Sequence, residues 1–249
     1  ILLIIYFSSC SESYVNSYRA LEIAFIDWYF KFNPTIASSL EIKKSNPYLQ
    51  KLDLDSREEY IADLERFQIE LIQIDNTKLP SNEKNNYILL DRFINQKLFD
   101  LHIDKSFEWD ASLYPIIIYE GIVSLIDFQN SDISFRTEIL ERRLAQSKLL
   151  FDNAYQNLKY KSTFHERLAF EVLDKLDFLL DELPLKVMSD NSTLDKIDNH
   201  IKLLKREIEK YTLWLKSEYS KFNDYSLNDR LKFIEERFEI FIGKEYSIN

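Results

Sequence analysis

Residues 192–217 read STLDKIDNHIKLLKREIEKYTLWLKS, and this stretch decides the fold class. Its apolar side chains recur at alternating spacings of 3 and 4 residues, at Leu194, Ile197, Ile201, Leu204, Ile208, Tyr211 and Leu215. This spacing predicts an α-helix with one apolar stripe along its length. The stripe fits two arrangements: an antiparallel helical hairpin within the chain, which we favour, or the seam of a coiled-coil dimer.

The rest of the chain repeats the helical pattern before and after that stretch. Apolar residues recur every three or four positions, and capping residues or prolines separate the periodic segments. The helices that we expect cover 13–32, begin at 56 and at 81, and cover 116–128, 131–158, 163–184, 192–217 and 227–241. A short turn at 35–40 follows the first of them. The sequence shows no linker and no internal repeat, so one helical body is the simplest organisation.

Local signals set several of these boundaries. Pro34 ends the first helix, because the residue before a proline avoids the α conformation. Capping boxes at 56–59 and 163–166 each open a helix, and Pro184 ends or kinks the second of these. Gly121 lies inside the very apolar segment 116–128, where it costs helix stability but allows another helix to approach closely.

Composition excludes several function classes. The chain has only two glycines, Gly121 and Gly243, whereas dinucleotide-binding and phosphate-binding loops need several closely spaced ones. The formal net charge is −10, and Lys and Arg are scattered among Asp and Glu. Nucleic acid is therefore not an expected partner, because phosphate binding needs clustered positive charge. Together these counts favour an all-α fold, a multi-helix bundle of antiparallel helices.

The first ten residues resemble the end of a bacterial lipoprotein signal. An apolar run at 1–7 is followed by Ser8, Ser9 and Cys10, the only cysteine in the chain. In such signals the cysteine after two small residues is lipidated and becomes the first residue of the mature protein. We therefore predict a partial signal peptide at 1–9, lipidation at Cys10 and a helical domain over 10–249. The alternative is an apolar N-terminal segment with a chance cysteine.

A lipid on Cys10 would place the protein in the bacterial cell envelope, with its domain outside the cytoplasm. The membrane would then be a partner through the N-terminal lipid anchor. Ser11, which follows Cys10, favours the outer over the inner membrane. We expect the protein to be a monomer.

The chain contains no recognisable active site. The histidines, His102, His165 and His200, lack the spacing of metal ligands. His165-Glu166 begins like a His-Glu-x-x-His zinc motif, but position 169 is alanine. A capping role for Glu166 is therefore the better interpretation. We predict no catalytic, cofactor-binding or metal-ligating residue in this chain.

Two further sets of residues have a structural interpretation. The mixed-charge cluster that we expect to be exposed consists of Glu138, Glu141, Arg142 and Arg143. The tryptophans that we expect in the core rather than against a substrate are Trp28, Trp109 and Trp214. Neither set adds a candidate for catalysis.

Four sequence motifs follow one another along the chain. They are 27–38, 107–114, the helix that contains Arg136, Arg143 and Leu144, and 211–215 followed by 242–246. Over about residues 20–246 this order resembles the N-terminal half of the bacterial family catalogued as domain of unknown function 885. The chain departs from the family pattern near Leu40, Ala111 and Ser147, where Gly, Pro and Pro are usual.

The resemblance implies a larger, all-helical fold similar to zinc metallopeptidases of the gluzincin type. The family's motif, His-Glu-x-x-Pro-Gly-His, would lie beyond residue 249, so zinc and a peptide substrate would belong to the full-length protein. This chain would then be a truncated N-terminal half that forms a wall of the substrate cleft. The alternative is a complete, non-catalytic helical envelope lipoprotein that acts as a binding or scaffold module.

Overall fold

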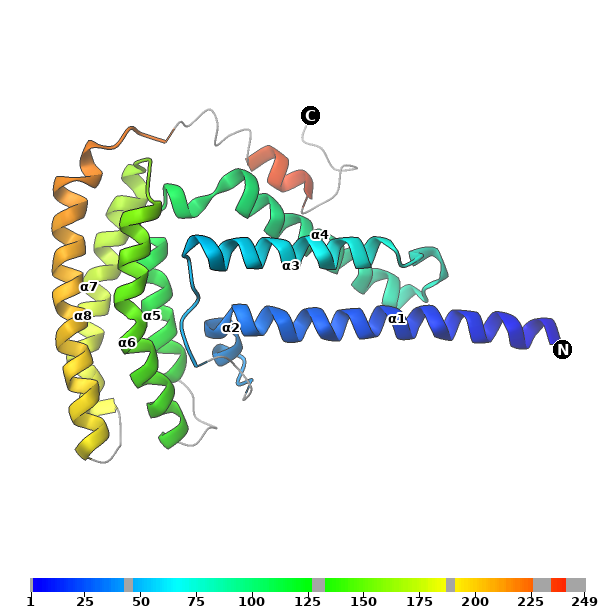
Figure 1. Cartoon of the computed structure of the whole chain (residues 1–249), viewed down its shortest axis with the longest axis horizontal. Helices are drawn as coiled ribbons and strands as arrows, with labels where there is room; N and C mark the ends of the chain where they lie inside the picture. The colour runs from blue at the N-terminus through cyan, green and yellow to red at the C-terminus, as the bar shows by residue number, and fades with distance from the viewer. Residues whose placement is uncertain (1, 43–46, 127–132, 187–190, 226–233, 241–249) are drawn as a thin grey trace. The chain divides into compact units, whose positions relative to one another are not determined.

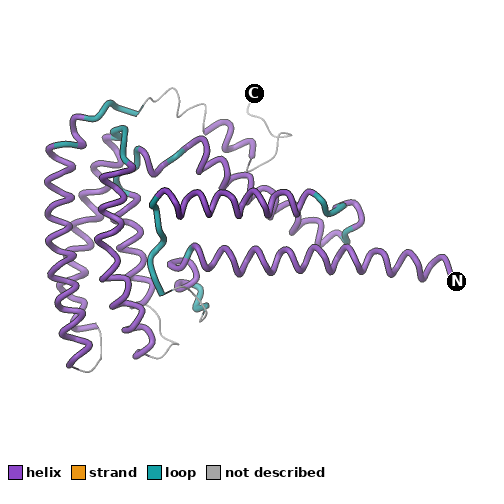
Figure 2. Tube along the Cα trace, in the orientation of Figure 1, coloured by secondary structure: helices purple, strands orange, loops and turns teal. Residues whose placement is uncertain are grey.

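The computed structural model of the chain describes residues 2–42, 47–126, 133–186, 191–225 and 234–240. This part of the chain is almost entirely helical and contains no β-strand (Figure 2). The α-helices are α1 (Leu2–Phe32), α2 (Pro34–Ser39), α3 (Leu54–Ile72), α4 (Ser81–Phe99), α5 (Leu113–Ile126), α6 (Ile133–Asn157), α7 (Thr163–Lys186) and α8 (Asn191–Ser217). Residues 234–240 are also helical. The predicted all-α class is confirmed.

The chain divides into two compact units. The first unit contains Ile1–Tyr29, Leu54–Lys105 and Ser226–Asn249, and the second contains Phe30–Asp53 and Ser106–Tyr225. The second unit is thus formed by two internal segments, and the first by three segments that include both ends of the chain. The predicted division into 1–9 and 10–249 stays a prediction.

The second unit is built around a four-helix bundle. Helix α5 contacts α6 and α7, and α8 contacts the same two helices, so the order around the bundle is α5, α6, α8, α7. Successive helices run in opposite directions (Figure 1). The short helix α2 packs against α5 from outside the bundle. The predicted antiparallel hairpin is confirmed, since α7 and α8 are neighbours in the same chain.

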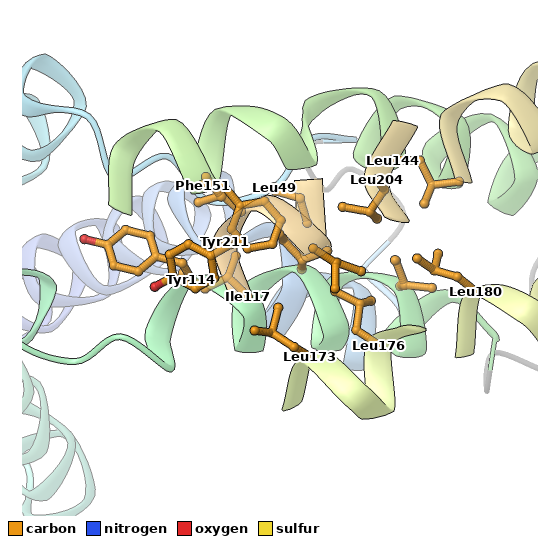
Figure 3. Packing of buried hydrophobic residues seen from close by; sticks show 14 of the residues in the cluster. Leu49, Tyr114, Ile117, Leu144, Phe151, Leu173, Leu176, Leu180, Leu204 and Tyr211 are labelled. Carbon is orange, nitrogen blue, oxygen red and sulfur yellow. The ribbon is translucent and has the colours of Figure 1, made fainter. Parts of the chain in front are cut away.

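The apolar stripe of α8 lies in the core of this bundle. Its buried members are Ile197, Ile201, Leu204, Ile208, Tyr211 and Leu215. Figure 3 shows two of them, Leu204 and Tyr211, among side chains of the other three helices, such as Phe151, Leu173 and Ile117. The stripe therefore packs against helices of the same chain, and burial of its apolar area stabilises the fold.

Buried tyrosines tie the bundle to the segment that precedes α5. Tyr211 donates its hydroxyl hydrogen to the carbonyl of Ala111 at 2.8 Å, and Tyr219 donates to the carbonyl of Trp109 at 2.9 Å. Tyr114 donates to the carbonyl of Phe107 at 2.6 Å. A buried hydroxyl without a partner would cost stability, so these bonds explain why tyrosine is tolerated in the core.

Aromatic packing holds the first unit together. Phe25 of α1 meets Phe67 of α3 edge-on, with 5.2 Å between ring centroids, and Trp28 stacks on Tyr60 at 4.9 Å. The indole nitrogen of Trp28 donates to Asp63 Oδ2 at 2.7 Å. The bulk of these rings lets α1 bury its inner face against α3 and α4. The expected core positions of the tryptophans are confirmed: Trp28 and Trp109 are buried, and Trp214 packs against the core.

Three helix starts differ from the sequence predictions. α1 begins at Leu2 rather than at residue 13, so the apolar run and Cys10 belong to the same helix. The expected turn at 35–40 is the helix α2, which Pro34 can begin because the first helical residue needs no donor. α3 begins at Leu54, before the predicted capping box at 56–59. For α1 and α3 the local sequence signals predicted the helix but not its first residue.

The predicted boundaries of α7 are also corrected. The amide of Glu166 donates to the carbonyl of Ser162 at 2.8 Å, so Ser162, not Thr163, is the N-cap residue. Its hydroxyl is 2.8 Å from His165 Nδ1, and this pair takes the place of the predicted capping box. α7 continues past Pro184 to Lys186. The predicted start of the last helix, at 226–227, lies outside the described residues.

Gly121 fills the predicted role of a close-approach position. A Cβ atom on this residue would overlap Leu49 Cδ2 and would lie 3.8 Å from Arg143 Cδ. Leu49 is itself buried, so it has little room to move. Only glycine leaves α5 space for the segment that carries Leu49.

We expect Gly121→Val to lower the free energy of unfolding by about 2 kcal/mol or more, because the added methyl groups overpack the site. Urea denaturation followed by circular dichroism measures this. Adding Leu49→Ala should recover part of the loss, and Glu120→Val, at an exposed position one residue earlier, should be close to neutral. Equal losses at 120 and 121 would contradict the packing argument.

Burial of tyrosine makes the stability of the fold depend on pH. It raises the pKa of Tyr155 from the ordinary 10.0 to about 12, mainly because the buried phenolate loses hydration. Between these two values the folded state holds a proton that the unfolded state has lost, so stability falls as pH rises. We expect Tyr155→Phe to make the decline in unfolding free energy between pH 10 and pH 12 shallower. The exposed Tyr160→Phe is the matched control, and identical slopes in all three proteins would refute the assignment.

Candidate functional site

A buried arginine lies where α2, α5 and α6 meet. Arg143 of α6 is fully buried, although the sequence placed it in an exposed charge cluster. That prediction was wrong for Arg143 and right for its neighbours Arg142 and Glu138, which are exposed and pair across one helical turn. The fourth member, Glu141, is partly buried and lies 3.7 Å from Lys196 Nζ.

Four neutral oxygens accept hydrogen bonds from the Arg143 guanidinium. Nη1 donates to the Gly121 carbonyl at 2.6 Å and to Ser124 Oγ at 3.1 Å. Nη2 donates to the Pro34 carbonyl at 3.2 Å and to Ser38 Oγ at 2.6 Å. One side chain of α6 therefore holds the end of α5 and both ends of α2. The planar, branched geometry of arginine makes this possible, since a lysine ammonium cannot reach both helices in fixed directions.

Burial lowers the pKa of Arg143 from 12.5 to about 10, because removing the cation from water disfavours its charge. The side chain remains charged at neutral pH. Its hydrogen bonds to the two carbonyls and two hydroxyls offset part of the cost of burying that charge.

A pocket of about 530 Å³ opens beside this arginine. The residues that line it are Thr35, Ile36 and Ser39 of α2, Glu41, and Tyr119, Glu120, Val123 and Ser124 of α5. Ser124 belongs both to the pocket and to the hydrogen bonds of Arg143. Glu41 has a φ of 58°, which turns the chain sharply just after α2. Arg143 thus fixes the distance between the two walls of the pocket.

The lining of this pocket suits the binding of a small molecule. Its volume lies in the range of small-molecule sites, and hydroxyl, phenol and carboxylate groups are mixed with two aliphatic side chains. No histidine or cysteine is among its described lining residues. We take the pocket between α2 and α5 as the candidate functional site.

The three histidines lie far apart in the sequence and have separate structural surroundings. His165 contacts Ser162, lies 3.8 Å from Asp110 Oδ2 and meets the ring of Trp109 edge-on at 4.9 Å. His102 lies in a π-helical turn, Asp100–Asp104, with its Nε2 3.3 Å from Glu65 Oε1 at an exposed site. His200 is partly buried beside the α8 stripe.

The described residues do not fit a zinc site. Within the described part of the chain, no three His, Cys, Asp or Glu side chains are grouped so that they could hold a metal ion. No chemical step through zinc is therefore derived for this chain. Cys10 lies on α1.

The helices of the described residues differ from a membrane-spanning helix in length or hydropathy. None of the single helices there is both long and apolar enough to cross a bilayer. One bent pair, Ser81–Glu108 with Leu113–Ile126, meets the length and composition criteria together.

The fold and site define a helical protein with an antiparallel four-helix bundle and a small pocket of mixed polar and apolar lining. No family model matches the chain, and no curated protein matches it. Among solved structures it is similar to "a putative lipoprotein of unknown function from Shewanella oneidensis", with a TM-score of 0.76 and 20% sequence identity. The match covers 90% of this chain and 42% of that one, so the chain spans less than half of that protein. At this identity the similarity establishes the fold alone.

Sequence reasoning missed Arg143 and the pocket for different reasons. Arg143 could have been found from its spacing, because Leu140, Leu144 and Ser147 share its helix face and all are buried. The pocket had no such signal, since α2 and α5 are about 80 residues apart in the sequence and α2 was expected to be a turn.

We expect Arg143→Ala to lower the free energy of unfolding by about 3 kcal/mol or more, because buried carbonyls lose their donor and a cavity remains. Arg142→Ala, one residue earlier on the exposed face, should change it by less than about 0.5 kcal/mol. Denaturation of both variants by urea gives the comparison. Equal stabilities would mean that Arg143 does not hold the three helices together.

Proposed function

We propose that this chain is the N-terminal helical part of a lipid-anchored protein of the bacterial cell envelope. The observation that carries the proposal is the similarity, over 90% of this chain, to a structure described as a putative lipoprotein. The chain's own apolar run, followed by Ser8, Ser9 and Cys10, supports the same anchor. Ser11 supports the outer membrane as its location.

A finer proposal concerns the whole protein. The resemblance to the domain of unknown function 885 family suggests a zinc metallopeptidase whose catalytic motif lies beyond residue 249. Two facts are compatible with the length and fold of such a protein: the chain spans 42% of the similar structure, and the Pro34–Ser38 stretch and Arg143, both in family-like motifs, bond to each other. In that protein the helices described above would form a wall of the peptide-binding cleft.

The second candidate is a non-catalytic envelope lipoprotein. The pocket between α2 and α5 favours it, because its mixed lining is suited to holding a small ligand. Such a protein would act as a binding or scaffold module.

Lipidation is tested by feeding isotopically labelled palmitate to cells that express the native gene. We expect label and membrane fractionation in the parent protein, and loss of both in Cys10→Ala. Ser13→Ala, three residues later, is the matched control and should behave as the parent. Membrane association that persists without Cys10, or an unlabelled parent, would refute the anchor.

The finer proposal is tested by reading the native gene beyond the codon for Asn249. A continuing frame that contains His-Glu-x-x-Pro-Gly-His, together with bound zinc in the full-length protein, would support the peptidase. A stop codon directly after Asn249 would refute it and leave the binding module.

A further inference from the structure

The position of Cys10 on α1 determines which surface of the first unit comes closest to the membrane. α1 is continuous from Leu2 to Phe32, so a mature chain that starts at Cys10 would be helical from its first residue. Tyr14 follows Cys10 by four residues, which is about 6 Å along a helix axis. Whatever lies beside Tyr14 is therefore held within one or two turns of the lipid.

The turn between α3 and α4 lies beside Tyr14. Lys78 Nζ donates to the Tyr14 hydroxyl at 3.0 Å and lies 4.5 Å from the centre of its ring. One turn further along α1, Arg19 pairs with the buried Glu83 of α4, with 2.6 Å between Nη2 and Oε1. In Figure 1 this turn lies alongside the N-terminal part of α1. These contacts fix the turn, residues 73–80, at the level of the anchor.

The chemistry of the two ends of α3 differs. At the end beside the turn, Ile69 and Ile72 are exposed at 58% and 66%. Cations there are paired with carboxylates, Lys78 with Asp75 of the same turn at 3.1 Å and Arg19 with Glu83. At the opposite end the exposed charges of α3 are acidic, at Asp55, Glu58 and Glu59. Exposed apolar side chains beside paired charges suit the interface of a bilayer, whereas clustered carboxylates do not.

We infer that the α3–α4 turn, with Lys78 and the adjoining Ile72, is a membrane-contacting surface that rests on phospholipid headgroups once Cys10 is lipidated. The inference rests on the proposed function, since without the lipid nothing brings this turn to a bilayer. Two contacts, the acyl chains on Cys10 and this turn, would then set the direction of α3 relative to the membrane.

The test uses the full-length lipidated protein with one added cysteine, because lipidation leaves Cys10 without a free thiol. Gln73→Cys places a nitrobenzoxadiazole probe at the turn, and Asp55→Cys places it about 27 Å away along α3. Both residues are exposed. The proteins are reconstituted into vesicles of phosphatidylcholine and phosphatidylglycerol that contain lipids spin-labelled in the headgroup.

We expect quenching of the probe at position 73 to be several-fold stronger than at position 55. Equal quenching at the two positions, or none at position 73, would overturn the inference. Flotation with the vesicles separates the two proposals: a protein that floats through Cys10 but shows no quenching at position 73 keeps its anchor and loses this surface. A protein that does not float fails the proposed function instead.

Discussion

The packing of α2 and α5 depends on one buried cation. Arg143 replaces the water that it loses with two carbonyls and two hydroxyls, and these come from two helices that are distant in the sequence. A charge in the core is costly unless its donors find acceptors, and both terminal nitrogens of Arg143 do so while Nε does not. The positions of α2 and α5 are therefore tightly constrained. Gly121 of α5 adds to this packing, because the absence of a Cβ atom leaves room for the Leu49 side chain. The pocket exists because this contact sets the gap between its walls.

Much of the fold could be predicted from periodicity. The stripe on α8 identified a helix whose inner face is buried, and Pro34 marked the end of α1 at the right residue. Helix starts were less predictable, since a cap depends on which oxygen the first amides meet in three dimensions. At α7 the sequence pattern favoured Thr163 as the cap, whereas the amide of Glu166 bonds to the carbonyl of Ser162 and makes that residue the N-cap. The division into two units had no signal in the sequence, because the chain crosses between them without a glycine-rich or proline-rich linker.

The candidate site was harder to predict than the fold. Charge is normally a sign of exposure, and Arg143 violates that rule for a reason that only tertiary structure supplies: its acceptors lie on other helices. The pocket combines short polar residues that are unremarkable in sequence, such as Ser39 and Ser124. Cys10 is the opposite case. Its meaning comes from a short local pattern that a processing enzyme would read, and the packing of the helices adds nothing to it.

The division of the chain has a consequence for the order in which the protein assembles. A chain synthesised from its N-terminus emerges with α1 first and residues 234–240 last among the described elements. The second unit has all its residues by Tyr225, whereas the first unit waits for the segment that places Arg237 Nη2 3.1 Å from Asp100 Oδ1. Domains fold as their residues become available, so the unit that starts the chain is the last to be completed. During synthesis, α1 therefore waits for the last described helical segment before its unit is complete.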